Sequence, residues 1–228
     1  MAFYFALLQR FYDSIGFSSE DTRFRELPPK DRAFYTTRAF DFEINSGLGW
    51  VEVVACNYRT DYDLSGHSRA SKKDLTVMEG DAKVLPHVIE LSLGVDRTLF
   101  LLLDKFFVHE QNRDVLRVSP RVSPYLAAVL PLISKPPFED AARAIFDRLK
   151  LEDFAVFYDE SGAIGRRYRR MDEIGTPYCV TVDPQTLEDH TVTLRQRDSM
   201  EQRRLKSDEL VDVLHRLRDQ MEPGTSTA

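Results

Sequence analysis

The chain has 228 residues, a length that suits one large domain or two modest ones. It carries 31 basic and 37 acidic residues, for a net charge of −6, and 43% of its residues are hydrophobic. This composition is that of a globular protein, and it excludes a disordered chain, a collagen-like repeat and a disulfide scaffold. Because the chain is acidic overall, any binding of nucleic acid must use a local basic patch.

The N-terminus and the two cysteines predict a soluble cytoplasmic protein with no membrane contact. The first residues include no basic leader, and Arg10 and Asp13 interrupt the apolar run, which therefore fits neither a signal peptide nor a membrane-spanning helix. Cys56 and Cys179 lie far apart and form no C-x-x-C metal or redox motif. They are therefore predicted to be reduced thiols buried in the core.

The first half of the chain predicts helices and an antiparallel set of strands. Gly16 suits the C-cap of the first helix, and residues 45–49 suit a hairpin turn. The polar stretch 65–81 is expected to be mobile. The predicted elements are a helix over 3–15, strands over 37–44, 50–58 and 87–93, and a helix over 95–106.

The apolar signal stops at residues 109–114, which predicts a domain boundary between residues 112 and 113. Strand and helix then alternate, which predicts a small α/β domain with a mixed sheet over 113–220. Residues 221–228 are predicted to be a disordered tail. The elements expected here are strands over 126–133, 154–158, 178–182 and 191–194, and helices over 138–149, 166–173 and 207–218.

Two glutamates occupy strands that look buried on both faces. Simple alternation places Glu52 on one face with Trp50, Val54, Cys56 and Tyr58, and Glu90 repeats the anomaly in its own strand. A carboxylate in a covered strand is costly unless a positive group meets it, and neither strand contains lysine or arginine. Either a small cation, such as an ammonium group or a metal, binds there, or the glutamates face solvent or pair with distant arginines such as Arg59 or Arg69.

The junction that follows the third strand suits a phosphate group. Gly94 permits a sharp turn from strand to helix, and Arg97 falls in the first helical turn. A helix N-terminus with a guanidinium beside it favours phosphate binding. The pattern is also compatible with an ordinary turn.

Two arginine-rich segments lie in the second half of the chain. Tyr168 stands among the first group and could stack on an unpaired base. The alternative is a solvated helix face on which Asp172 and Glu173 pair with the arginines. The two groups are Arg166, Arg167, Arg169 and Arg170, and then Arg195, Arg197, Arg203 and Arg204.

These segments carry a family resemblance. Residues 49–53 (Gly-Trp-Val-Glu-Val) and 58–64 (Tyr-Arg-Thr-Asp-Tyr-Asp-Leu) resemble the sequence before the third class II signature of glycyl-tRNA synthetases. Residues 86–97 resemble that signature in its archaeal and eukaryotic form, although Leu91 stands where the family usually has proline. The blocks that resemble the family's anticodon-binding domain are 161–168, 172–175 and 194–202.

The resemblance implies a fold of the α/β (α+β) class. Residues 1–112 would form the C-terminal part of a class II catalytic domain, with a partial antiparallel sheet and helices. Residues 113–220 would form an α/β anticodon-binding domain with a mixed sheet.

The resemblance also implies an activity, that of a glycine–tRNA ligase. Glycine is first activated with ATP and Mg²⁺ to glycyl-adenylate and is then transferred to tRNA-Gly. Arg97 would be the catalytic residue. The glycine-binding residues would be Glu52, Glu90, Leu91, Ser92, Leu93 and Gly94; those for ATP would be Glu52, Val53, Gly94, Val95, Asp96 and Arg97; those for tRNA would be Arg166, Arg167, Tyr168, Arg170, Arg195 and Arg197.

Two features of the family are missing. Its first signature helps to form a dimer interface, its second supplies an arginine for the α-phosphate, and both would lie upstream of residue 1. Arg25 and Glu26 only superficially resemble the second signature, because they are adjacent and the segment is expected to follow a helix instead of lying in a strand. We therefore expect a truncated or split ligase, either a homodimer or completed by an N-terminal catalytic half, whose activity alone is open.

The alternative is a non-catalytic tRNA- or RNA-binding accessory protein derived from a synthetase. Retention of the glutamates and Arg97 favours the enzyme, and the missing signatures favour the accessory role. The five histidines show no ligand spacing, so no protein-bound metal is expected.

Overall fold

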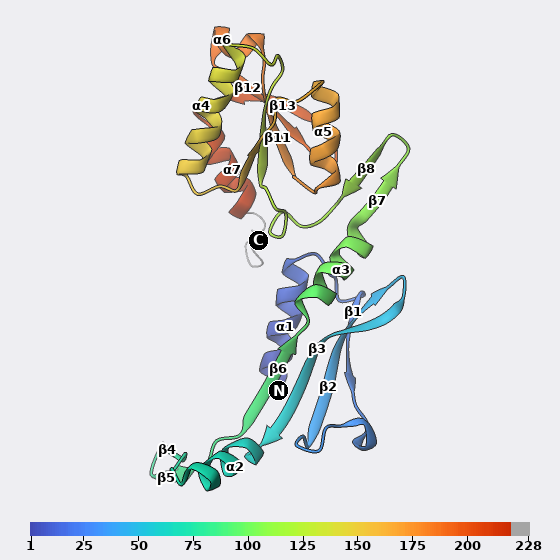
Figure 1. The fold of residues 1–228 in the computed structure, drawn as a ribbon, viewed down its shortest axis with the longest axis vertical. Coiled ribbons are helices and arrows are strands. Elements are labelled where there is room, and N and C mark those ends of the chain that lie inside the picture. Colours follow the sequence, from blue (N-terminus) through green and yellow to red (C-terminus); the bar gives the residue numbers. More distant parts are fainter. Residues whose placement is uncertain (220–228) are drawn as a thin grey trace, which may run out of the picture. The chain divides into compact units, whose positions relative to one another are not determined.

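A computed structural model describes residues 1–219 of the chain and divides it into two compact units (Figure 1). The N-terminal unit consists of Met1–Asp13 and Phe17–Lys105, and the C-terminal unit holds Ser14–Gly16 and the chain from Phe106 onward. The division falls before the boundary predicted at residue 112. The tail predicted over 221–228 lies outside the described residues.

The N-terminal unit is built on a four-stranded antiparallel sheet with the strand order β1-β2-β3-β6. The strands are β1 (Thr22–Glu26), β2 (Arg38–Ser46), β3 (Gly49–Thr60) and β6 (Val88–Leu93). The last three were predicted. The expectation that Arg25 and Glu26 lie outside a strand is wrong, because β1 pairs with β2 from end to end.

One face of this sheet, the apolar face, carries Phe24, Phe40, Phe42, Val54, Cys56 and Leu91, as the strand registers require. Helix α1 (Ala2–Ser14) packs on it through Tyr12, whose ring centroid lies 4.8 Å from that of Phe42. The Tyr12 hydroxyl also lies 3.1 Å from the hydroxyl of Thr98 on α3 (Val95–Phe106). Both helices therefore belong to the apolar face.

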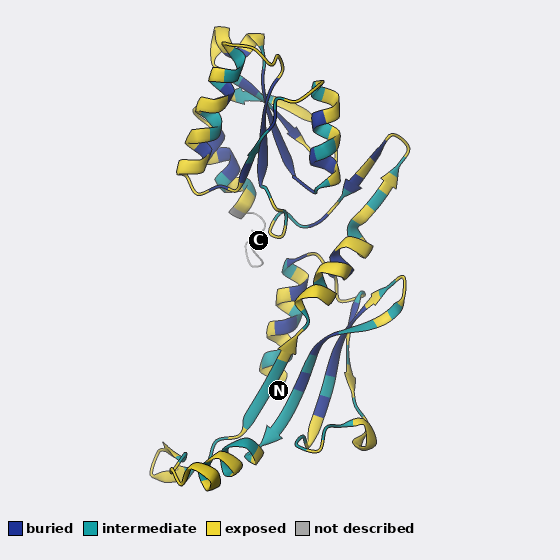
Figure 2. Cartoon of the chain, viewed as in Figure 1, coloured by how far each residue is buried: buried dark blue, intermediate teal, exposed yellow. Residues whose placement is uncertain are grey.

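The stretch expected to be mobile has regular structure. It contains α2 (Tyr62–Ser71) and a small hairpin of β4 (Val77–Glu79) and β5 (Ala82–Val84). A 3₁₀ turn, η1 (Pro29–Asp31), lies between β1 and β2. Few of these residues are buried, which is why the sequence shows no apolar period there (Figure 2).

The C-terminal unit begins with the hairpin β7 (Phe107–Glu110) and β8 (Arg113–Leu116). Its main sheet has the order β10-β9-β11-β12-β13 and is mixed, as predicted. Strand β9 (Ala127–Pro131) is parallel to β10 (Val156–Tyr158) and β11 (Tyr178–Val182), whereas β12 (Thr191–Gln196) and β13 (Gln202–Lys206) are antiparallel additions. The edge strand β13 was not predicted.

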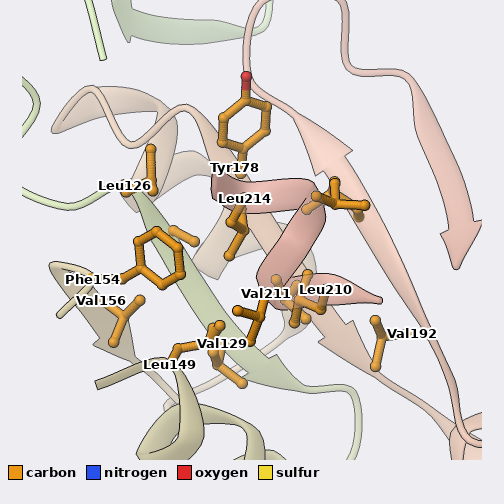
Figure 3. Close-up of a cluster of buried hydrophobic side chains, with 14 of the residues drawn as sticks. Leu126, Val129, Leu149, Phe154, Val156, Tyr178, Val192, Leu210, Val211 and Leu214 are labelled. Carbon is orange, nitrogen blue, oxygen red and sulfur yellow. The ribbon is translucent and has the colours of Figure 1, made fainter. Parts of the chain in front are cut away.

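Helices cover both faces of this mixed sheet. Residues of α4 (Phe138–Leu151) and α7 (Leu210–Asp219) enter the larger core cluster; Leu149 of α4 and Leu214 of α7 are labelled in Figure 3. Helix α5 (Ile164–Glu173) covers the other face, where Met171 packs with Ala128, Leu130 and Cys179. The short helix α6 (Pro184–Asp189) is an unpredicted element closed by a capping box on Asp183.

Both cysteines are free and buried, as predicted. Within residues 1–219, none of the helices combines the length and the apolar character that are needed to cross a membrane.

Candidate functional site

A β-bulge in β3 decides where Glu52 points. Phe42 of β2 pairs with Val54, but the next residue, Glu43, pairs with Glu52, so Val53 is the extra residue of the bulge. The bulge reverses the alternation and corrects the sequence-based assignment. Glu52 lies on the face opposite to Val54, and 42% of its side chain is exposed.

The face that receives Glu52 is polar. The registers β1 to β2, β2 to β3 and β3 to β6 bring charged and amide side chains into line across four strands. We call this the polar face, and its residues are Arg23, Arg25, Asp41, Glu43, Glu52, Asn57, Glu90 and Ser92.

Ion pairs with β1 hold the inner carboxylates of the polar face. Arg25 donates to Asp41 at 2.6 Å and to Glu43 at 2.7 Å, and Arg23 donates to Glu43 at 2.6 Å. Burial, followed by the charge of Glu52, raises the pKa of Asp41 in spite of Arg25. The strand register places Glu52 directly opposite Glu43, at the edge of this cluster.

Glu90 has the arginine partner that sequence reasoning left open. Its Oε2 accepts from Arg59 Nη1 at 2.9 Å and from Asn57 Nδ2 at 3.4 Å. Its Oε1 has no hydrogen-bond partner among the described residues, and 32% of the side chain is exposed. The carboxylate is therefore anchored on one oxygen and open on the other.

The junction after β6 brings Arg97 to Glu52. The backbone N–H of Gly94 donates to the carbonyl of Val53 at 2.8 Å, which fixes the start of α3 against the bulge. Arg97 Nη1 then donates to the Glu52 carbonyl at 3.0 Å and lies 3.4 Å from Glu52 Oε1. The Arg97 side chain is 57% exposed, so a phosphate can reach it.

The other sequence-predicted residues divide between the two faces. Ser92 lies on the polar face, opposite Ala55, and is exposed. Leu91 and Leu93 pair with Cys56 and Val54 and lie on the apolar face. Val95 and Asp96 are exposed in the first turn of α3, whereas Val53 is buried at the bulge.

Taken together, the polar face has one carboxylate oxygen that is open, a second half-exposed carboxylate, a hydroxyl and a guanidinium at a helix N-terminus. Carboxylates and a hydroxyl suit an ammonium group, and the guanidinium suits a phosphate. Among residues 1–219, no three His, Cys, Asp or Glu side chains are arranged to hold a metal ion.

The C-terminal unit places half of the predicted RNA-binding side chains in its interior. Arg167 is buried and donates to the carbonyls of Pro131 and Asp159, at 2.5 and 3.2 Å. Arg195 and Arg197 are only 3% exposed. The guanidinium groups of these three arginines donate hydrogen bonds to acceptors inside the protein. The expectation that they present positive charge to RNA is therefore wrong.

The exposed cations lie along one face of α5. Arg166 is exposed, and its side chain has no ion pair or hydrogen bond among the described residues. Arg170 is partly exposed and pairs with Asp159 at 2.5 Å, and Arg169 is exposed beside Asp172. Tyr168 is half-buried, with its hydroxyl 2.6 Å from that of Thr181, so its ring is not free to stack as predicted.

Helix α5 begins near the carboxyl end of β10, and Arg170 pairs with Asp159, the residue that follows this strand. Strand β9 is flanked by β10 on one side and β11 on the other, and α4 and α5 cover opposite faces. Ligands of open α/β sheets bind at such a switch point. Sequence reasoning missed this relationship because it depends on strand order. It also missed Arg113 as a partner of the buried Asp172, whereas it had named Arg59 as one of two possible partners of the glutamates.

Known proteins are similar in sequence to both units of the chain. A family model for the anticodon binding domain matches residues 127–217. The chain is 43% identical to the glycine–tRNA ligase of Bifidobacterium longum, covering 90% of this chain and 45% of the ligase. The ligase of Clostridium tetani is 46% identical over 88% of this chain and 44% of its own length, and that of Thermococcus sibiricus is 36% identical over 95% and 52%. The chain thus spans about half the length of these relatives.

Proposed function

We propose that this chain, a homologue of one half of glycine–tRNA ligases, binds glycine and ATP on its polar face and tRNA-Gly through its C-terminal unit. The activity would be the ATP-dependent ligation of glycine to that tRNA, in the cytoplasm. The observation that carries the proposal is the gathering of Glu52, Glu90 and Ser92 on one sheet face, with Arg97 in contact with Glu52.

The chemistry follows from the charges of these groups. The glycine ammonium binds between the Glu52 and Glu90 carboxylates, and Ser92 adds a hydrogen bond. The glycine carboxylate attacks the α-phosphorus of ATP, and pyrophosphate leaves with the electrons of the broken P–O bond. Arg97 stabilises negative charge on the phosphates, which enter as the Mg²⁺ complex of the substrate. A crowded pocket beside Glu52 selects glycine because it leaves no room for a side chain.

The tRNA surface that we propose is the exposed part of α5 and the adjacent loop. Arg166, Arg169 and Arg170 contribute positive charge there, from one face of the helix. Because the chain carries a net charge of −6, this local patch must supply the phosphate contacts.

A further polypeptide is part of the proposal. Helix α1 exposes Phe3 and Leu7, and α3 exposes Val95, Leu99 and Leu103, each set one helical turn apart. The partner is either a second copy of the chain or a polypeptide that corresponds to the half of the relatives that this chain does not span.

The test is glycine-dependent exchange of pyrophosphate into ATP by the purified chain, alone and with the unspanned half of the Clostridium tetani ligase added. We expect exchange in at least one of these mixtures. Glu52→Gln should abolish it, while Glu20→Gln, at an exposed carboxylate of the same unit, should not. Absence of exchange in both mixtures would overturn the catalytic proposal.

A second candidate function rests on the C-terminal unit. Its match to the anticodon binding domain favours tRNA binding whether or not the chain is catalytic. Specific binding of tRNA-Gly without any exchange would therefore favour a non-catalytic accessory protein. The enzyme is preferred because Glu52 and Glu90 lie on paired strands and Arg97 contacts Glu52.

A further inference from the structure

Arg59, near the C-terminal end of β3, ties four elements of the N-terminal unit together. Its Nη1 donates to Glu90 Oε2 on β6 at 2.9 Å, and its Nη2 donates to Asp63 Oδ1 on α2 at 2.6 Å. Its guanidinium carbon lies 4.2 Å from the ring centroid of Tyr35, in the loop before β2. The side chain is only 20% exposed, so these contacts hold the guanidinium in one orientation.

This geometry determines which Glu90 oxygen is available. Arg59 and Asn57 both donate to Oε2, from two positions on β3. Oε1 is left without a partner among the described residues, on the same face as Glu52 and Ser92. A carboxylate held on one oxygen cannot rotate freely, and its second oxygen is aimed in a fixed direction.

The charges around Glu90 are suited to one monovalent cation. Arg59 contributes one positive charge, and Asp63 and Glu90 contribute two negative charges, so the group retains one net negative charge. A bound ammonium would neutralise it. Without Arg59 the group would be doubly negative, and the Glu90 carboxylate would have no charged donor to orient it.

We propose that Arg59 is a positioning residue, which fixes Glu90 through Oε2 so that Oε1 receives the ammonium group of the amino-acid substrate. The inference deepens the proposed function and rests on it. Asp63 and Tyr35 serve the same purpose one step further out, because they hold the Arg59 guanidinium from its other edge and its face.

Charge and position have opposite effects at Arg59, and this separates them experimentally. If Arg59 were only a nearby cation, its removal would strengthen the attraction between Glu90 and an ammonium group, and glycine would bind more tightly. If Arg59 positions Glu90, Arg59→Gln weakens glycine binding in spite of the charge change. Arg59→Lys keeps the charge but loses the planar fork that joins Glu90 to Asp63, and should also weaken binding.

The experiment is calorimetric titration of the full chain with glycine and, separately, with ATP and Mg²⁺. We expect the dissociation constant for glycine to rise about tenfold or more in Arg59→Gln and Arg59→Lys, with ATP affinity unchanged. Arg38→Gln removes an exposed arginine from the neighbouring strand and should change neither affinity. Trp50 fluorescence and circular dichroism verify the fold of each variant.

The other outcomes are distinct from one another. Unchanged or tighter glycine binding by both Arg59 variants would overturn the positioning role alone. Equal losses of glycine and ATP affinity would show that Arg59 only ties α2 to the sheet, and would overturn it as well. If the folded wild-type chain, with and without the added half of the relative, binds no glycine, the proposed function fails and this inference fails with it.

Discussion

Asp172 of α5 is fully buried, and both of its carboxylate oxygens accept from Arg195 of β12, at 2.7 and 3.0 Å. Arg113 of β8 donates to the same carboxylate at 3.0 Å, and its side chain is 2% exposed. Arg195 was expected on a basic RNA surface and Asp172 on a solvated helix face, but together with Arg113 they form an internal ion-pair network. It joins the hairpin β7–β8, helix α5 and the antiparallel side of the mixed sheet.

Removal of this carboxylate should be strongly destabilising. Asp172→Asn keeps the size of the side chain but leaves two buried guanidinium groups without their shared anion, a loss of about 3–5 kcal/mol in the free energy of unfolding. Urea unfolding followed by far-ultraviolet circular dichroism measures this loss. The single tryptophan, Trp50, belongs to the N-terminal unit, so the transition seen by its fluorescence should not move. A loss below about 1 kcal/mol would contradict the role of the network.

The arginines of the C-terminal unit should separate into two functional classes. Arg166→Ala should weaken tRNA binding and reduce the slope of log K against log salt by about 1, because one exposed phosphate contact is lost. Its stability should stay within about 0.5 kcal/mol of wild type. Arg216→Ala, at another exposed arginine of the same unit, is the matched control and should leave the salt slope unchanged.

Arg197→Gln should behave in the opposite way. Arg197 Nη1 donates to the carbonyls of Val118 and Gly175, at 3.1 and 2.8 Å, so its loss leaves buried acceptors unsatisfied. We expect a lower free energy of unfolding, and tRNA binding with an unchanged salt slope in the fraction that is folded. A reduced slope would mean that Arg197 contacts RNA after all.

The fold could be predicted from the sequence wherever burial leaves a periodic signal. Strand β11 was predicted with its observed bounds. Tyr178–Val182 is buried on both faces of the sheet and therefore forms a short, nearly continuous apolar run in the sequence. Strands β1 and β13 were missed for the opposite reason. They lie at sheet edges, and β1 owes its place to the pairing of Arg23 and Arg25 with carboxylates of β2.

The candidate site could be predicted only by residue type. Glu52 and Glu90 were singled out because their charges did not fit their strands, and Arg97 because a guanidinium in the first turn of a helix suits a phosphate. The faces and partners of all three depend on tertiary structure. The bulge at Val53 has no sequence signature, and Glu90 meets Arg59 because of a strand register that composition does not encode. Likewise, arginines are usually exposed, so nothing in the pattern marked Arg167 or Arg197 as buried.

The two thiols should be unreactive in the native protein. Burial raises the pKa of Cys56 and of Cys179 to about 12, so almost no thiolate exists at pH 8. Titration with a colourless disulfide reagent at pH 8 should release no chromophore until urea is added, and two equivalents afterwards. Rapid reaction of one thiol in the native state would show that the unit containing it opens readily.

The acid sensitivity of the C-terminal unit should depend in part on Asp183. Arg204 donates to both of its oxygens, at 2.6 and 2.8 Å, and the backbone N–H of Thr186 donates at the start of α6. The ion pair with Arg204 and then the cap hold the pKa of this carboxyl below its usual range, although burial acts in the opposite direction. The folded state thus binds the proton more weakly than the unfolded state, whose value is near 4. The stabilisation is present above pH 4 and is lost as the pH falls through the folded value.

Asp183→Asn should therefore lower the free energy of unfolding at pH 7 by about 2 kcal/mol, because it removes charge-assisted hydrogen bonds and weakens the cap. The difference between wild type and variant should shrink as the pH is lowered from 5 towards 2, since the wild-type carboxylate becomes protonated and loses the same interactions. Urea unfolding by circular dichroism at pH 7 and pH 3 measures both values. Asp147→Asn, at an exposed carboxylate of α4 with no ion pair among the described residues, should show no such change. A difference that stays constant with pH would mean that hydrogen-bond geometry at the cap, and not the charge of Asp183, carries the stabilisation.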